Sequence, residues 1–269
     1  MDQKFFLGIG LAVVIVFAAS AVYINLQKNA PASADQDVLY QVSTIDAVMQ
    51  GVYEGVLPIG DLKKHGDFGI GTFHALDGEM TVLDGVVYQI KADGQVYTVP
   101  DSETTPFASV TYFKGDRTVT TVVPMNSSVF TATMEKQLPT RNMIYAVKIH
   151  GTFPVMKVRA PPEQQEPYPT LPEALKNQSI YTYSDTTGTI LGFYTPVFFK
   201  GVNVPGYHLH YLSDDRTTGG HILDFNIPQG TVVEYDITEN FAMALPTSGD
   251  FTGVDLSQDL SEELAKVEK

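Results

Sequence analysis

The chain has 269 residues, and its 17 lysine and arginine residues against 31 aspartate and glutamate residues give a formal net charge of −14. Hydrophobic residues make up 43% of it, which is typical of a globular protein and excludes general disorder. The acidic balance argues against nucleic-acid binding, and we expect no nucleic-acid partner. Cysteine and tryptophan are absent, so any metal must be bound by histidines and carboxylates rather than by thiolates.

The N-terminus carries an uncharged apolar run over residues 5–24, preceded by Lys4. A helix of this length spans about 30 Å, the thickness of a bilayer core. Residues 32–34 (Ala-Ser-Ala) form a signal-peptidase pattern, but the run is long for a signal peptide, which favours an uncleaved anchor. We therefore assign residues 1–34 as a signal peptide or membrane anchor. The expected protein is exported: it is either membrane-anchored with an extracytoplasmic catalytic domain, or secreted if cleaved after Ala34.

Residues 35–160 predict a sheet-rich N-terminal domain that opens with a short helix. Ser43 or Thr44 can cap this helix, and apolar residues at positions 45, 48, 49 and 52 share one face. Asp-Gly pairs at residues 77–78, 84–85 and 93–94 favour tight turns, and therefore a meander of strands. Further strands are expected at residues 107–113, 118–123 and 144–149, and a helix over residues 126–137, capped by Asn126 or Ser127.

A proline-rich connector over residues 161–172 is the best candidate for a domain boundary, because prolines continue neither a strand ladder nor a helix. Thr170 and Glu173 then fit a capping box for a short helix. The C-terminal domain, residues 173–269, predicts strands at 188–194, 206–212, 220–226 and 231–237 and a terminal helix within 257–269. This mixture of elements favours an α/β (mixed α+β) fold of two domains.

Three of the six histidines, His208, His210 and His221, lie within 14 residues. Side chains at i and i+2 of a strand share one face, so His208 and His210 can point toward one site. The polar segment 213–218 and the two glycines after it predict a hairpin that sets His221 opposite His210. Three neutral imidazoles are typical of an open catalytic zinc site, although two half-exposed strand histidines and an unrelated third would give the same pattern. A general acid or base would come from elsewhere, and Glu79, directly after an Asp-Gly turn, is one candidate.

Several longer motifs resemble the α-acetolactate decarboxylase family. These motifs are residues 65–73 (HGDFGIGTF), 76–79 (LDGE), 206–210 (GYHLH) and 219–221 (GGH). Residues 40–44 (YQVST), 141–142 (RN) and 192–196 (GFYTP) also fit, so the resemblance covers about residues 39–268. Residues 255–263 depart from the family pattern.

The resemblance implies a zinc-dependent lyase that removes CO₂ from 2-acetolactate to give acetoin, on two α/β domains that each contain a mixed sheet. The metal ligands that it implies, for Zn²⁺ or another divalent metal, are His208, His210 and His221. The catalytic residues that it implies are Glu79, Arg159, Glu268 and Thr72. The metal would act as a Lewis acid on the ketone and hydroxyl oxygens, Arg159 would hold the carboxylate, and Glu79 or Glu268 would donate the proton. The expected partners are this small-molecule substrate, the membrane if the N-terminal segment stays uncleaved, and a second copy if the enzyme is a homodimer.

Three alternatives remain open. A cupin-type metalloprotein also uses an H-x-H strand, but it requires a glutamate shortly after, where this chain has Asp214 and Asp215. An exported binding module with a structural metal site predicts four protein ligands, whereas catalysis predicts three ligands and an exchangeable water. A family member that has lost turnover is disfavoured by the retained Glu79, Arg159 and three histidines.

Overall fold

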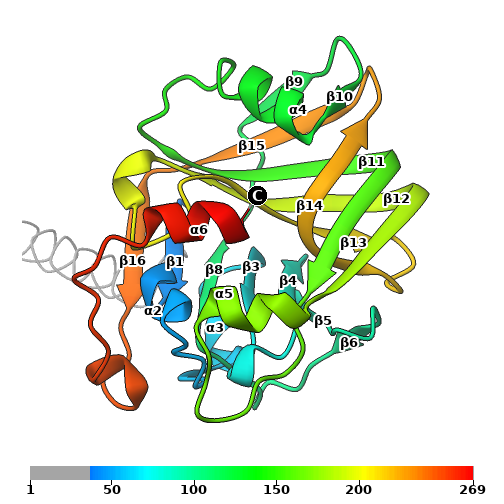
Figure 1. The fold of residues 1–269 in the computed structure, drawn as a ribbon. Helices are drawn as coiled ribbons and strands as arrows, with labels where there is room; N and C mark the ends of the chain where they lie inside the picture. Colours follow the sequence, from blue (N-terminus) through cyan, green and yellow to red (C-terminus); the bar gives the residue numbers. More distant parts are fainter. Residues whose placement is uncertain (1–36, 269) are drawn as a thin grey trace, which may run out of the picture. The chain divides into compact units, whose positions relative to one another are not determined.

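A seven-stranded sheet forms one half of residues 37–268, the part of the chain that the computed structural model describes (Figure 1). Its strands are β1 (Val38–Val42), β3 (Phe68–Thr72), β4 (Glu79–Leu83), β5 (Val86–Ile90), β6 (Val96–Thr98), β8 (Ala108–Thr111) and β16 (Asn240–Ala244). They follow the order β16-β1-β8-β3-β4-β5-β6. The β1–β16 pair is parallel and the others are antiparallel, so this sheet is mixed, as predicted.

The predicted meander is confirmed, because the three Asp-Gly pairs lie in the connections that join β3, β4, β5 and β6. Gly78, Gly85 and Gly94 all have a positive φ. At Gly78 a Cβ would also lie 2.3 Å from the carbonyl oxygen of Ile90, so both the backbone conformation and the lack of space require glycine in this turn. The turn therefore sets the position of Glu79, the first residue of β4.

A second sheet has seven strands in the order β10-β14-β13-β12-β11-β15-β9. These are β9 (Arg117–Thr120), β10 (Met125–Asn126), β11 (Ile144–Ala160), β12 (Ser179–Thr195), β13 (Gly206–Ser213), β14 (Gly219–Ile227) and β15 (Val232–Thr238). All its pairs are antiparallel, so the prediction of a mixed sheet is wrong for this second sheet. Hairpins join consecutive strands from β11 to β14, and hairpin connections impose antiparallel pairing. A separate two-stranded ladder joins β2 (Leu57–Pro58) to β7 (Thr104–Thr105).

The proline-rich connector does not separate the two sheets along the chain. Residues 117–160, which precede the connector, supply β9, β10 and β11 of the second sheet, and β16, which follows it, belongs to the first. The prolines end β11 at Ala160, but pairing with β12 begins at once from Ser179, so residues 161–178 are the connection of a long hairpin. The expectation that residues 35–160 and 173–269 each hold one sheet is corrected by this ladder.

The expected signal peptide or anchor, residues 1–34, lies outside the described residues. Within residues 37–268, no helix is both long and apolar enough to cross a membrane.

Short helices begin where the sequence predicts them. Thr44 caps α2 (Ile45–Met49) through a bond from the Ala47 N–H, and Asn126 caps α4 (Ser127–Met134). α5 (Leu171–Ala174) also starts after Thr170, but that side chain makes no capping bond. Pro172, at the second helical position, has no N–H to donate to a capping side chain. The next N–H, that of Glu173, donates to the Thr170 backbone carbonyl instead. The structure also has α3 (Ile59–Leu62), and the predicted terminal helix is α6 (Ser261–Val267).

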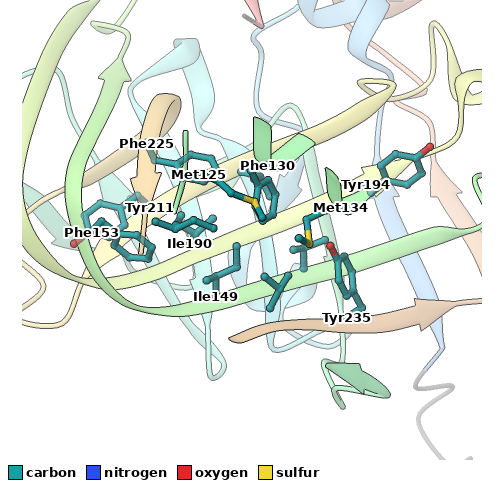
Figure 2. Close-up of a cluster of buried hydrophobic side chains, with 14 of the residues drawn as sticks. Met125, Phe130, Met134, Ile149, Phe153, Ile190, Tyr194, Tyr211, Phe225 and Tyr235 are labelled. Carbon is teal, nitrogen blue, oxygen red and sulfur yellow. The ribbon is translucent and has the colours of Figure 1, made fainter. Parts of the chain in front are cut away.

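Buried side chains pack in distinct clusters around these elements. One lies between the sheets, where Leu39 and Phe68 of the first meet Phe193 of the second. Another fills the curl of the second sheet beneath α4, as Figure 2 shows for Phe130, Tyr211 and their neighbours. A third joins α2, α5 and α6, and it fixes the end of α6 beside the site described below.

Asp236 on β15 is a buried carboxylate whose two oxygens are not both hydrogen-bonded within residues 37–268. One oxygen accepts a hydrogen bond from the Lys114 N–H at 3.1 Å, and the other has no partner among the described residues. Burial, reinforced by nearby Asp116 and Asp37, raises its pKa to about 6. A raised carboxyl pKa means that the folded state binds this proton more tightly than the unfolded state. The group's contribution to stability therefore falls as the pH rises from about 4 to about 6.

We expect Asp236→Asn to stabilise the fold at neutral pH by about 1–2 kcal/mol, because the amide removes the buried charge and can donate to Asp116. The difference in free energy of unfolding from the parent should vanish near pH 4 and grow toward pH 7, measured by urea titration at each pH. A difference independent of pH would contradict this explanation.

Candidate metal centre and active site

Three buried histidines converge from two neighbouring strands. His208 and His210 project from the same face of β13, and His221 on β14 pairs directly with His210. This pairing confirms the predicted hairpin. Each of the three residues is at most 8% exposed, and the candidate ligand nitrogens lie within 4.8 Å of one another.

The protonation state of these imidazoles suits a metal. His210 Nδ1 lies 2.8 Å from the Met80 carbonyl oxygen, which can only accept, so Nδ1 carries the hydrogen and Nε2 is left as a free acceptor. Nδ1 of His208 and Nε2 of His210 and His221 are buried without a partner among the described residues. Burial lowers the pKa of all three, to about 3 for His208, so the rings are neutral. Unpartnered neutral imidazoles are the donor set that zinc takes, and these residues therefore fit a divalent metal.

Close backbone contact fixes His221 beside Arg159. β14 pairs with β11 as well as β13, and Arg159 faces His221 in that ladder. Gly220 has φ +137°, and a Cβ there would lie 2.5 Å from the Arg159 carbonyl oxygen. Glycine at 220 therefore allows the two strands to approach.

Arg159 lies between two carboxylates in a buried ion group. Its guanidinium lies 3.1 Å from Glu268 and 4.0 Å from Glu79, and it also donates to the Val267 carbonyl. Glu79 lies 3.6 Å from Nε2 of His210, and Glu268 lies 3.7 Å from Nε2 of both His208 and His221. The predicted residues Glu79, Arg159 and Glu268 are therefore brought to the histidine cluster from three distant segments.

Burial raises the pKa of Glu79 to about 8, against the opposing effect of Arg159. The pKa of Glu268 is also raised by burial, and Arg159 opposes this shift too. Two buried carboxylates share one guanidinium, so protein cations alone do not balance their charge. A divalent cation on the adjacent histidines would supply the missing positive charge.

Thr72, also predicted, supports the turn that carries Glu79. Its hydroxyl donates to the Gly78 carbonyl at 2.7 Å, and Thr72 pairs with Glu79 across β3 and β4.

Sequence reasoning missed Gln89, whose side-chain amide donates to the backbone and side-chain oxygens of Asp77 in the same turn. An uncharged, buried polar residue on a strand gives no sequence signal of its own, so only its contacts identify it.

The same groups line a cavity together with a set of apolar residues, which we call the apolar wall. Its polar lining consists of Thr72, Glu79, Arg159, His208, His210, His221 and Glu268. Its apolar lining consists of Ile45, Val48, Gly71, Leu76, Phe107, Pro161, Leu171 and Leu175. The helical spacing predicted that Ile45 and Val48 share one face of α2, but it gave no sign that they face a site.

The remaining histidines and the hairpin aspartates serve other contacts. His65 stacks on Tyr40, His74 accepts from the Gly55 N–H, and His150 pairs with Asp214 at 3.0 Å. Asp215 binds within the β13–β14 turn. The carboxylate ligand that a cupin-type site requires is therefore not supplied by either aspartate.

Comparison with known proteins identifies the family. The sequence model for alpha-acetolactate decarboxylase matches residues 39–258. The chain belongs to the α-acetolactate decarboxylase family. The Methanosarcina mazei member is 52% identical over 233 residues, 87% of this chain and 81% of that protein. The Methylococcus capsulatus member is 42% identical over 238 residues, 88% and 91% of the two chains.

The fold agrees with this assignment. The X-ray structure of α-acetolactate decarboxylase from Bacillus subtilis strain 168 superposes with a TM-score of 0.83 at 36% identity, covering 86% of this chain and 99% of that one. The resemblance read from the motifs is thus confirmed, and the chain is an enzyme of a carboxy-lyase family.

Loss of one ligand should abolish metal binding. We expect purified His208→Ala to retain less than about a tenth of the parent's bound metal, because two imidazoles hold a divalent ion far more weakly than three. Elemental analysis after dialysis measures this. His150→Ala, a histidine on the surface pair with Asp214, is the matched control and should keep the parent's metal content. Equal metal in both variants would exclude the three-histidine site.

Proposed function

We propose that this enzyme decarboxylates 2-acetolactate to acetoin with a divalent metal, zinc, held by His208, His210 and His221. The observation that carries the proposal is the convergence of three buried imidazoles, whose candidate ligand nitrogens lie within 4.8 Å of one another, with Arg159 and two carboxylates in one cavity. Family membership supports the substrate, and a set of three neutral imidazole donors suits zinc.

Zinc, when bound, would supply Lewis acidity toward the ketone and hydroxyl oxygens of the substrate, and the ketone oxygen is the one that accepts electron density as CO₂ leaves. The chain itself must hold the carboxylate that departs. Arg159 is suited to this because it is buried and its Nε–H has no hydrogen-bond partner among the described residues. That free N–H is available to a carboxylate oxygen, and in a buried cavity such a charge-assisted bond is strong.

The reaction also requires one proton. When the bond to the carboxylate carbon breaks, its electron pair stays on the substrate, and a proton must be added there to give acetoin. We assign this donation to Glu79, because its position is fixed by β4, by the Gly78 turn and by Thr72. Water then returns a proton to Glu79. Glu268 is held by Arg159 at 3.1 Å, and its proposed role is to orient that guanidinium.

The apolar wall has a role in the same scheme. Ile45, Val48 and Leu175 face the cavity, where they exclude water and accept the methyl groups of the substrate. A dry cavity strengthens the interactions of Arg159 and Glu79 with the reacting groups.

We also propose, from the apolar run at residues 5–24, that this activity operates outside the cytoplasm on an anchored or secreted protein.

Activity should depend on a removable metal. We expect the full-length chain in mild detergent to release acetoin from racemic 2-acetolactate, to lose this activity after chelation, and to regain it with Zn²⁺, all followed by an acetoin assay. Circular dichroism before and after chelation checks that the fold persists. If folded, metal-loaded protein released no acetoin, the proposed reaction would be wrong.

Removing the proton donor should leave the metal in place. We expect Glu79→Gln to keep the parent's metal content while kcat falls about 10²–10⁴-fold, the usual contribution of a general acid. Glu173→Gln, at a solvent-exposed pair with Lys176, is the matched control and should be fully active. Normal turnover in Glu79→Gln together with loss in Glu268→Gln would transfer the donor role to Glu268.

A further inference from the structure

An apolar patch lies at one edge of the first sheet. We call it the edge patch and define it as Val197, Phe198, Phe199, Phe241, Met243 and Leu245. Val197 and Phe198, in the turn of η3 (Val197–Phe199), are 78% and 64% exposed. The Phe199 ring lies 5.3 Å from Phe198 and 5.0 Å from Phe241, so the turn and β16 form one continuous surface.

The strand beneath this patch lacks the usual protection of a sheet edge. β16 is an outer strand of the first sheet, and residues 240–246 (NFAMALP) contain no charge, in a chain with 17 basic and 31 acidic residues. Soluble proteins normally protect such edges with charged side chains, and contiguous exposed apolar patches mark surfaces that meet a partner or a membrane. The edge patch therefore has the character of a covered surface.

The place where the undescribed N-terminal chain joins the fold indicates what covers it. β1 and β16 are parallel, and the Asn240 N–H donates to the Asp37 carbonyl at 2.9 Å, so residues 1–36 join the fold beside the start of β16. Between the apolar run 5–24 and β1 lie the 13 residues 25–37. A chain of that length spans at most about 45 Å when fully extended. An anchor in residues 5–24 would therefore keep Asp37, and with it the start of β16, within this distance of the bilayer.

We propose that the edge patch is the surface of the anchored protein that contacts the lipid bilayer, with Val197 and Phe198 at the acyl boundary. This inference goes beyond the reaction and rests on the proposed anchor. The lipid is zwitterionic, because a net charge of −14 opposes binding to anionic headgroups. One small apolar turn binds a bilayer only weakly, but a tether raises its local concentration to the millimolar range, so anchor and patch act together.

The absence of tryptophan gives a direct test. Phe198→Trp places a single indole in the exposed turn. Tyr97→Trp places one at a similarly apolar, 41% exposed position on β6, the opposite edge of the same sheet, as the matched control. Both full-length variants are reconstituted in phosphatidylcholine vesicles, with and without brominated acyl chains. We expect a blue-shifted emission and several-fold stronger bromine quenching for F198W, and no quenching above background for Y97W. Circular dichroism confirms that both are folded.

Each other outcome overturns a defined part of the inference. If the full-length chain does not float with the vesicles, both the anchor and the membrane contact are wrong. If it floats but F198W is quenched no more than Y97W, the anchor stands and the bilayer-facing patch is wrong. If the F198W emission shifts to the blue in detergent as protein concentration rises, the patch joins two copies of the chain instead. Acetoin release is independent of all three readings, so failure here is distinguishable from failure of the proposed reaction.

Discussion

The site depends on the closure of β14 onto β11. Because β14 pairs on one side with β13 and on the other with β11, His210, His221 and Arg159 occupy one row across three strands. Gly220 permits this approach, since a side chain there would collide with the Arg159 carbonyl. Backbone hydrogen bonds thus set the spacing between these two histidines and the guanidinium. Such a ladder holds the groups more rigidly than loops could, as preorganised chemistry requires.

Charge balance within the cavity explains why an acidic protein can act on an anion. With Glu79 protonated, as its raised pKa and its proposed role as proton donor require, the three neutral imidazoles, Arg159 and an ionised Glu268 sum to zero charge. A divalent cation on the histidines would make the sum two positive charges, which attract the substrate carboxylate. These groups are buried and weakly screened, whereas the charges behind the net −14 lie mostly at the surface and are screened within about 10 Å by salt. The local charge therefore decides substrate binding, and the overall acidity favours solubility.

The sequence predicted what depends on neighbouring residues and missed what depends on distant ones. Asp-Gly turns, the caps at Thr44 and Asn126 and the β13–β14 hairpin follow from short-range conformational preferences, and each is present. The proline-rich segment was misread because prolines end a strand locally but do not prevent its ladder from resuming after an intervening loop. Closure of β14 on β11 and the support of the turn by Gln89 leave no local pattern. The motifs named in advance residues that the fold brings together in one cavity, whereas the roles of these residues stay a prediction.

The helix cluster links the two walls of the cavity. Leu264 of α6 packs with Ile45 and Val48 of α2 and with Leu171 and Leu175 of α5, and these α2 and α5 side chains also line the cavity. Figure 1 shows the end of α6 directed to the place where the sheets meet, and Glu268 follows that helix. The packing that excludes water from the apolar wall therefore also sets where the Glu268 carboxylate meets Arg159. A change in the size of a wall residue would move α6, and with it a charge beside the histidines, because close-packed interiors transmit displacements. Shape selection and electrostatics in this enzyme are thus coupled through one small group of helices.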